Sequence, residues 1–131
     1  MAWAHLIFGI LVFIVFLVTG RFMRADFPDK EIIPPELRLL MRSRHIYILL
    51  SALAHILLGL YLQIHAETRR KILQLLGSFL LFTASVLLIW AFRQETYATH
   101  NFSDLSRYGL YASLGGTIFH LLAGVRIKSK T

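Results

Sequence analysis

Four long apolar stretches constrain this chain more than any other feature of its sequence. Residues 46–64 and 72–92 contain no Asp, Glu, Lys or Arg, and each approaches the about 20 residues that a helix needs to cross a bilayer. The hydrophobic share of 56% exceeds the about 45–50% that is usual in soluble domains. A water-soluble fold of 131 residues has too little interior to bury so much apolar surface.

These stretches predict an all-α integral membrane protein with one domain, residues 1–131. We expect a four-transmembrane-helix up-down bundle, in which the first span is retained because "VTGRFM" is not a clean cleavage site. The loop at 21–43 carries the turn-forming "IIPPE", and Pro35 is suited to begin a short interfacial helix within it. The expected spans are residues 3–20, 44–64, 71–92 and 105–126.

The net charge of +7 is explained by basic residues at the span ends. They occur in "RSRH", "TRRK" and "RIKSK", where they meet the head groups of the lipid bilayer. They divide almost evenly between the two predicted faces, which leaves the orientation open. No basic face with interleaved aromatic residues is present, so nucleic acid is not an expected partner. The absence of cysteine excludes disulfides and thiolate metal sites.

Histidine is the only ionisable residue in the middle of the predicted spans, and such residues are costly enough to indicate a site. Three of the six histidines share a pattern, because glycine follows each by four residues in "AHLIFG", "AHILLG" and "FHLLAG". In the second and fourth spans a small residue also precedes the histidine by four, so that each set lies on one stripe of its helix. The members are His5 with Gly9, Ser51 with His55 and Gly59, and Gly116 with His120 and Gly124.

One interpretation of this pattern is a b-type haem site for electron transfer. His55 and His120 would be the axial ligands, since imidazole is a common haem ligand and helical bundles hold cofactors between facing helices. Gly59, Gly124, Gly116 and Ser51 would let the flat macrocycle approach the backbone. His5 competes as a ligand, because it lies at the same end of the bundle as His120. The three histidines together could instead bind one Zn or Cu ion, with His55 and His120 as the first two ligands.

The alternative interpretation is a tetraspan subunit or packing partner without a cofactor. Small residues at four-residue spacing form close helix contacts in membranes, and a histidine among them can hydrogen-bond to the neighbouring helix. The sequence offers no set of catalytic residues, and we expect no enzymatic activity. A homo-oligomer or hetero-oligomer would form through the third span, with Gly77, Ser78 and Ser85 as a seam, or through the glycine-rich fourth span.

Overall fold

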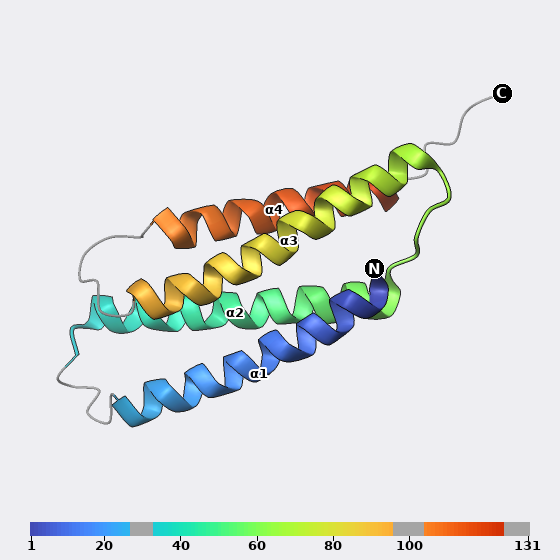
Figure 1. Cartoon of the computed structure of the whole chain (residues 1–131). Helices are drawn as coiled ribbons and strands as arrows, with labels where there is room; N and C mark the ends of the chain where they lie inside the picture. The colour runs from blue at the N-terminus through green and yellow to red at the C-terminus, as the bar shows by residue number, and fades with distance from the viewer. Residues whose placement is uncertain (27–32, 96–103, 125–131) are drawn as a thin grey trace.

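The computed structural model of the chain describes residues 1–26, 33–95 and 104–124. Its regular structure within these ranges is α-helical, as the apolar stretches predict. The helices alternate in direction along the bundle (Figure 1), so that the chain starts at the end of the bundle where α4 finishes. They are α1 (Ala2–Asp26), α2 (Pro35–Tyr61), α3 (Thr68–Glu95) and α4 (Asp104–Gly124).

The first loop differs from the prediction. Pro35 does begin a helix, with its fixed φ angle suited to the first turn, but this helix continues without a break to Tyr61. The prediction of a separate interfacial helix is therefore wrong. The physical reason is that no proline or glycine lies between Pro35 and Gly59, so nothing in the backbone favours a break where the chain enters the membrane.

The end of α2 is set by contacts with α3. Leu62 is extended, and its N–H donates to the carbonyl of Leu58. The amide of Gln74 on α3 then holds the outgoing chain, because its Nε2 donates to Gln63 O at 2.7 Å and its Oε1 accepts from the N–H of His65 at 3.2 Å. The second span thus ends three residues earlier than the predicted limit of 64.

Three helices, α1, α2 and α3, are long and apolar enough to cross a membrane. α4 is not among them, so the structure supports the membrane prediction in this coarser form. Large apolar side chains point outward on every helix, and a soluble monomer rarely exposes such continuous apolar surface. Examples from the four helices are Ile7, Leu57, Phe79 and Leu121, which are 57%, 56%, 68% and 63% exposed.

The bundle consists of two closely packed helix pairs, α1 with α2 and α3 with α4, and fewer contacts join α2 to α3. Glycine makes both close contacts possible. A Cβ atom on Gly59 would lie 2.6 Å from Cα of Leu6, and one on Gly116 would lie 2.8 Å from the carbonyl oxygen of Gly77. Such approaches of two backbones are the usual role of small residues between membrane helices.

The predicted outer seam of the third span lies inside the bundle instead. Gly77, Ser78 and Ser85 are all buried, and Gly77 faces Gly116 and His120 of α4. These three residues are therefore not available as a contact surface for another protein. The reason is that α3 uses these small residues for its contacts inside the bundle, where Gly77 meets α4 and Ser78 bonds to His5 of α1.

Replacement of Gly116 by Leu is expected to destabilise the protein more than replacement of Leu122 by Ala. The larger side chain at 116 would collide with Leu81, whose Cγ would lie 2.7 Å from a Cβ atom at this position. Overpacking of this kind costs about 1–3 kcal/mol or more, whereas Leu122 is 55% exposed and its truncation removes few contacts. Thermal unfolding of both variants in one detergent measures the difference. Equal shifts of the midpoint would contradict the close contact between α3 and α4.

Candidate functional site

Beside an apolar core, the interior of the bundle contains a cluster of polar side chains. Histidine, serine and glutamine side chains from α1, α2 and α3 are almost fully buried where the two helix pairs meet. Buried polar groups of this kind are stable in a bilayer only when they bond to one another. The set comprises His5, Ser51, His55, Gln74, Ser78 and Ser85.

A continuous chain of hydrogen bonds links all of these side chains except Gln74, and it extends to His120 of α4. His120 Nε2 lies 3.3 Å from Ser78 Oγ, and Ser78 Oγ lies 2.8 Å from His5 Nε2. His5 Nδ1 in turn lies 2.7 Å from His55 Nδ1. His55 Nε2 lies 3.0 Å from Ser85 Oγ, which also bonds to the hydroxyl of Ser51. We call the residues His120, Ser78, His5 and His55 the histidine relay.

The positions of the hydrogen atoms in the relay follow from the contacts of His55. The carbonyl of Leu81 can only accept, and it lies 3.3 Å from His55 Nε2, so this nitrogen carries a hydrogen. It donates to Leu81 and also to the hydroxyl of Ser85, whose own hydrogen goes to the same carbonyl at 2.9 Å. A neutral imidazole has one donor and one acceptor nitrogen. His55 Nδ1 therefore accepts, and His5 Nδ1 donates to it.

The same rule determines where the hydrogen atoms lie between His5, Ser78 and His120. Because His5 donates through Nδ1, its Nε2 accepts the hydroxyl hydrogen of Ser78. Ser78 then accepts the Nε2 hydrogen of His120, which leaves Nδ1 of His120 as an acceptor. This atom is buried, and no hydrogen-bond partner for it is found in the described part of the chain. All hydrogen bonds of the relay thus point the same way, and its one unused acceptor is at His120.

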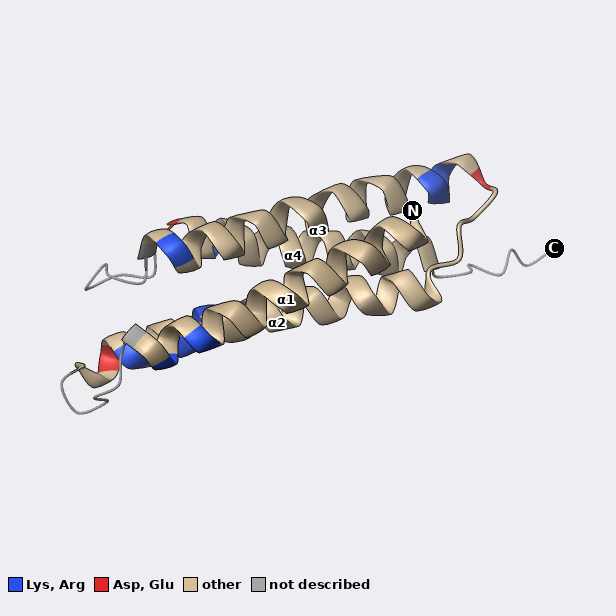
Figure 2. Cartoon of the chain, turned by 60° about the horizontal axis from the view of Figure 1, so that its bottom comes forward, with Lys and Arg blue, Asp and Glu red and all other residues tan. Residues whose placement is uncertain are grey.

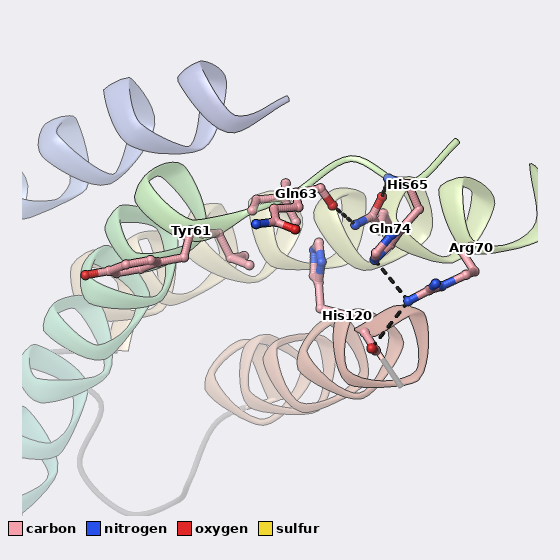
Figure 3. Close-up of a pocket in the computed structure, with 9 residues that line it drawn as sticks. Tyr61, Gln63, His65, Arg70, Gln74 and His120 are labelled. Carbon is pink, nitrogen blue, oxygen red and sulfur yellow. Dashed lines mark hydrogen bonds between the residues drawn. The ribbon is translucent and has the colours of Figure 1, made fainter. Parts of the chain in front are cut away.

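His120 also lines a cavity of about 430 Å³ at one end of the bundle (Figure 3), which we call the His120 cavity. Its polar wall is rigid, because Arg70 donates to the carbonyls of Ala123 and Gly124 and to His65 Nε2. Gln74 is held by the two bonds to the end of α2 described above. Apolar side chains of α2, Leu58 and Tyr61, line the rest.

His55, at the other end of the relay, lines a second cavity of about 190 Å³ between α2, α3 and α4, here called the His55 cavity. Five of its ten lining residues are leucine or alanine, and hydroxyl groups from α2 and α4 lie among them. They belong to Tyr47, Ser51, Ser113 and Thr117. The relay therefore connects two separate cavities.

The structure brings the three predicted histidines together. The rings of His5 and His55 stack with centroids 4.8 Å apart, and those of His5 and His120 meet edge to face at 6.0 Å. Ser51 joins the same network through Ser85. The glycines have other roles, since Gly59 and Gly116 lie in helix contacts and Gly124 faces open space with nothing within 4 Å.

Ser78 and Ser85 are the site residues that the sequence interpretation missed, because it assigned them to an outer seam. A signal for their true position exists. Gln74, Ser78, Leu81 and Ser85 follow one another at spacings of four, three and four residues, which places them on one stripe of α3.

The observed contacts leave no gap for a haem between His55 and His120. His5 and Ser78 connect these two ligands, and the ring of His5 also stacks on Phe82 at 4.8 Å. An imidazole nitrogen lies about 2 Å from a bound first-row metal ion, so a direct contact of 2.7 Å between two ring nitrogens is too short for an ion between them. A haem would need the His5 ring to move out.

The three-histidine metal site likewise has no support in these contacts. Among residues 1–26, 33–95 and 104–124, no group of three or more His, Cys, Asp or Glu side chains is arranged to hold a metal ion. The ring nitrogens that would bind it are engaged with one another and with Ser78. Only Nδ1 of His120 is left to donate a lone pair.

None of the family models, curated proteins or solved structures compared with the chain matches it. Function is therefore inferred from the chemistry of the site alone.

Proposed function

We propose that this protein conducts protons across its membrane through the histidine relay and the two cavities. The observation that carries the proposal is that His120 lines one cavity, His55 lines the other, and an unbroken chain of hydrogen bonds joins them. Chains of ionisable residues such as histidine inside a membrane are typical of proton pathways.

The proposal includes α4 as a fourth span, as the sequence predicts. α4 is 21 residues long, so it extends for about 31 Å at 1.5 Å per residue, close to the thickness of the hydrocarbon core. It packs along α3, and its His120 bonds to a buried serine of that helix. A helix that supplies a relay residue in this way lies beside α3 within the membrane.

Transfer of the first proton along the relay needs no rearrangement of heavy atoms, whereas the next proton can follow only after the rings of His120 and His5 have turned to restore their starting tautomers. A proton that reaches Nδ1 of His120 allows its Nε2 hydrogen to pass to Ser78, whose hydroxyl hydrogen passes to His5 Nε2. The Nδ1 hydrogen of His5 then passes to His55, which becomes an imidazolium with both nitrogens protonated. His120 and His5 end as neutral rings in the opposite tautomer, so one proton has entered and one positive charge has moved to His55.

The His55 cavity continues the path toward the opposite surface. Tyr47 lies eight residues, or about 12 Å, from His55 along α2, and it is three residues from the predicted start of the span at residue 44. At the other end, His120 is four residues, or about 6 Å, from the end of α4. The hydroxyls of the His55 cavity would hold water, since a buried water needs two to four polar partners. His55 Nε2 would release its proton toward this water through the hydroxyls of Ser85 and Ser51, of which Ser51 lines the cavity.

Proton uptake by lipid vesicles tests this function. Purified protein is reconstituted into vesicles that contain a pH-sensitive dye, and a potassium diffusion potential with valinomycin drives protons inward. We expect faster internal acidification than in protein-free vesicles. Acidification at the protein-free rate would contradict proton conduction and would favour the alternative of a tetraspan packing partner, in which the relay only holds the helices together.

Binding of b-type haem by the same histidines is the second candidate function. The observation that favours it is the convergence of His5, His55 and His120, three residues that the sequence pattern selected for this role. The ring of His5 would have to leave its bonds to His55 and Ser78 for the haem to enter. If haem is bound, protein from haem-replete cells is expected to show a Soret band that shifts on reduction by dithionite. His120→Ala should abolish that band, and His45→Ala should leave it unchanged. Folded protein that stays colourless after haem is added would exclude this candidate.

A further inference from the structure

We propose that a groove between α1 and α2 binds the phosphate group of an anionic phospholipid, independently of the histidine relay. The groove has a volume of about 540 Å³ and lies at the end of the helix pair opposite to the His120 cavity. Figure 2 shows basic residues gathered at this end of α1 and α2. We call it the Arg21 groove, and its lining residues are Phe16, Leu17, Gly20, Arg21, Arg24 and His45.

The groove combines an apolar and a cationic half along one stripe of α1. Leu17, Gly20, Arg21 and Arg24 follow at spacings of three, one and three residues, so they lie above one another on the same face of the helix. Both arginines are exposed, and neither has an ion-pair partner among the residues that the structure describes. Two exposed guanidinium groups on one face suit the bidentate binding of a phosphate.

The level of the groove in the membrane suits a lipid ligand better than an ion from bulk water. Arg21 follows Ala2, the first helical residue, by nineteen residues, which corresponds to about 28 Å, close to the about 30 Å of hydrocarbon in a bilayer. The arginines therefore lie at head-group level when α1 starts at the opposite surface. Phe16 and Leu17 lie one turn deeper, where the acyl chains begin.

Contacts between α1 and α2 keep the groove open and fix its floor. The hydroxyl of Thr19 donates to Phe16 O at 2.9 Å, so it accepts the Nδ1 hydrogen of His45 at 3.1 Å. The ring of His45 stacks on Phe16 with centroids 4.2 Å apart. Gly20 leaves the space above this ring free, because a Cβ atom there would lie 3.2 Å from His45 Nε2.

Native mass spectrometry with phosphatidylglycerol and phosphatidylcholine tests the site. The double variant Arg21→Gln and Arg24→Gln is expected to lower the affinity for phosphatidylglycerol relative to phosphatidylcholine by about thirtyfold, the combined effect of two basic residues at a membrane surface. The matched control is Arg69→Gln with Lys71→Gln, which removes the same charge from two exposed residues at the other end of the bundle. An equal loss in both variants would contradict a specific site.

Two further measurements refine the assignment. The first tests whether the shape of the groove, and not only its charge, binds the lipid, and the second tests whether the ligand is a lipid or free phosphate. Gly20→Leu keeps both arginines but fills the groove, and it should weaken retention of phosphatidylglycerol. Unchanged retention would contradict the role of the groove. Inorganic phosphate at millimolar concentration should not displace the lipid. Displacement by phosphate would mean that the site binds a free anion, and the assignment to a lipid would be wrong.

Discussion

Replacement of His5 by Phe is expected to reduce proton uptake by reconstituted vesicles about a hundredfold. His5 is the centre of the relay, since its two nitrogens bond to His55 and to Ser78. Phenylalanine keeps a flat ring against Phe82 but can neither accept nor donate a proton. A positioned proton-transfer group commonly contributes 10² to 10⁴ in rate, so its loss should leave little flux. The measurement is the rate of dye response under a fixed potassium diffusion potential.

The controls distinguish a broken relay from a damaged fold. His45→Phe removes a half-buried histidine of α2 that bonds to Thr19 outside the relay, and it should retain most of the flux. Ser78→Ala should lose flux like the His5 variant, because it separates His120 from His5, whereas Ser78→Thr keeps a hydroxyl and should recover part of it. Full flux in the His5 and Ser78→Ala variants would refute the pathway.

Among replacements of glycine by alanine, Gly59→Ala is expected to destabilise this protein most. The added Cβ would lie 2.6 Å from N, Cα and Cβ of Leu6 on α1. Two of these atoms belong to the backbone, so α1 must move away from α2 as a unit. The expected cost is about 1–3 kcal/mol or more, seen as a lower midpoint of thermal unfolding in detergent.

The same substitution at Gly124 provides the matched control. Gly124 ends α4, and a Cβ atom there meets nothing within 4 Å, so Gly124→Ala should be neutral or slightly stabilising, because alanine is the better helix former. Similar midpoints for the two variants would show that α1 and α2 do not approach as closely as described.

The helices were predictable from the sequence because their signal is local. An uncharged run of about 20 residues needs no knowledge of its neighbours to be read as a helix. The start of α2 at Pro35 was predictable for the same reason, and the structure confirms it. The continuity of α2 was not predicted, because the change from charged to apolar residues near His45 resembles a boundary although the backbone has no reason to break there.

The arrangement of the site was only partly predictable. The repeated spacing of histidine and glycine selected His5, His55 and His120, and the structure places all three in one network. The rotation of α3 about its own axis was not inferred, because Ser78 and Ser85 were interpreted with Gly77 as an outer seam and not with Gln74 as the polar stripe of the helix. That rotation decides whether Ser78 and Ser85 face lipid or the histidines, and it depends on contacts with α1, α2 and α4 that no single stretch of sequence contains.

The division into two helix pairs has a consequence for how the protein is made. In the proposed four-span arrangement, each pair would be a helical hairpin able to enter the bilayer by itself, because its backbone bonds are satisfied internally and its glycine contacts lie within the pair. His5 already meets His55 in the first hairpin, and Ser78 meets His120 in the second. The bonds between hairpins, from Ser78 to His5 and from His55 to Ser85, form only on docking. If the two pairs insert separately, the histidine relay is completed only when they dock.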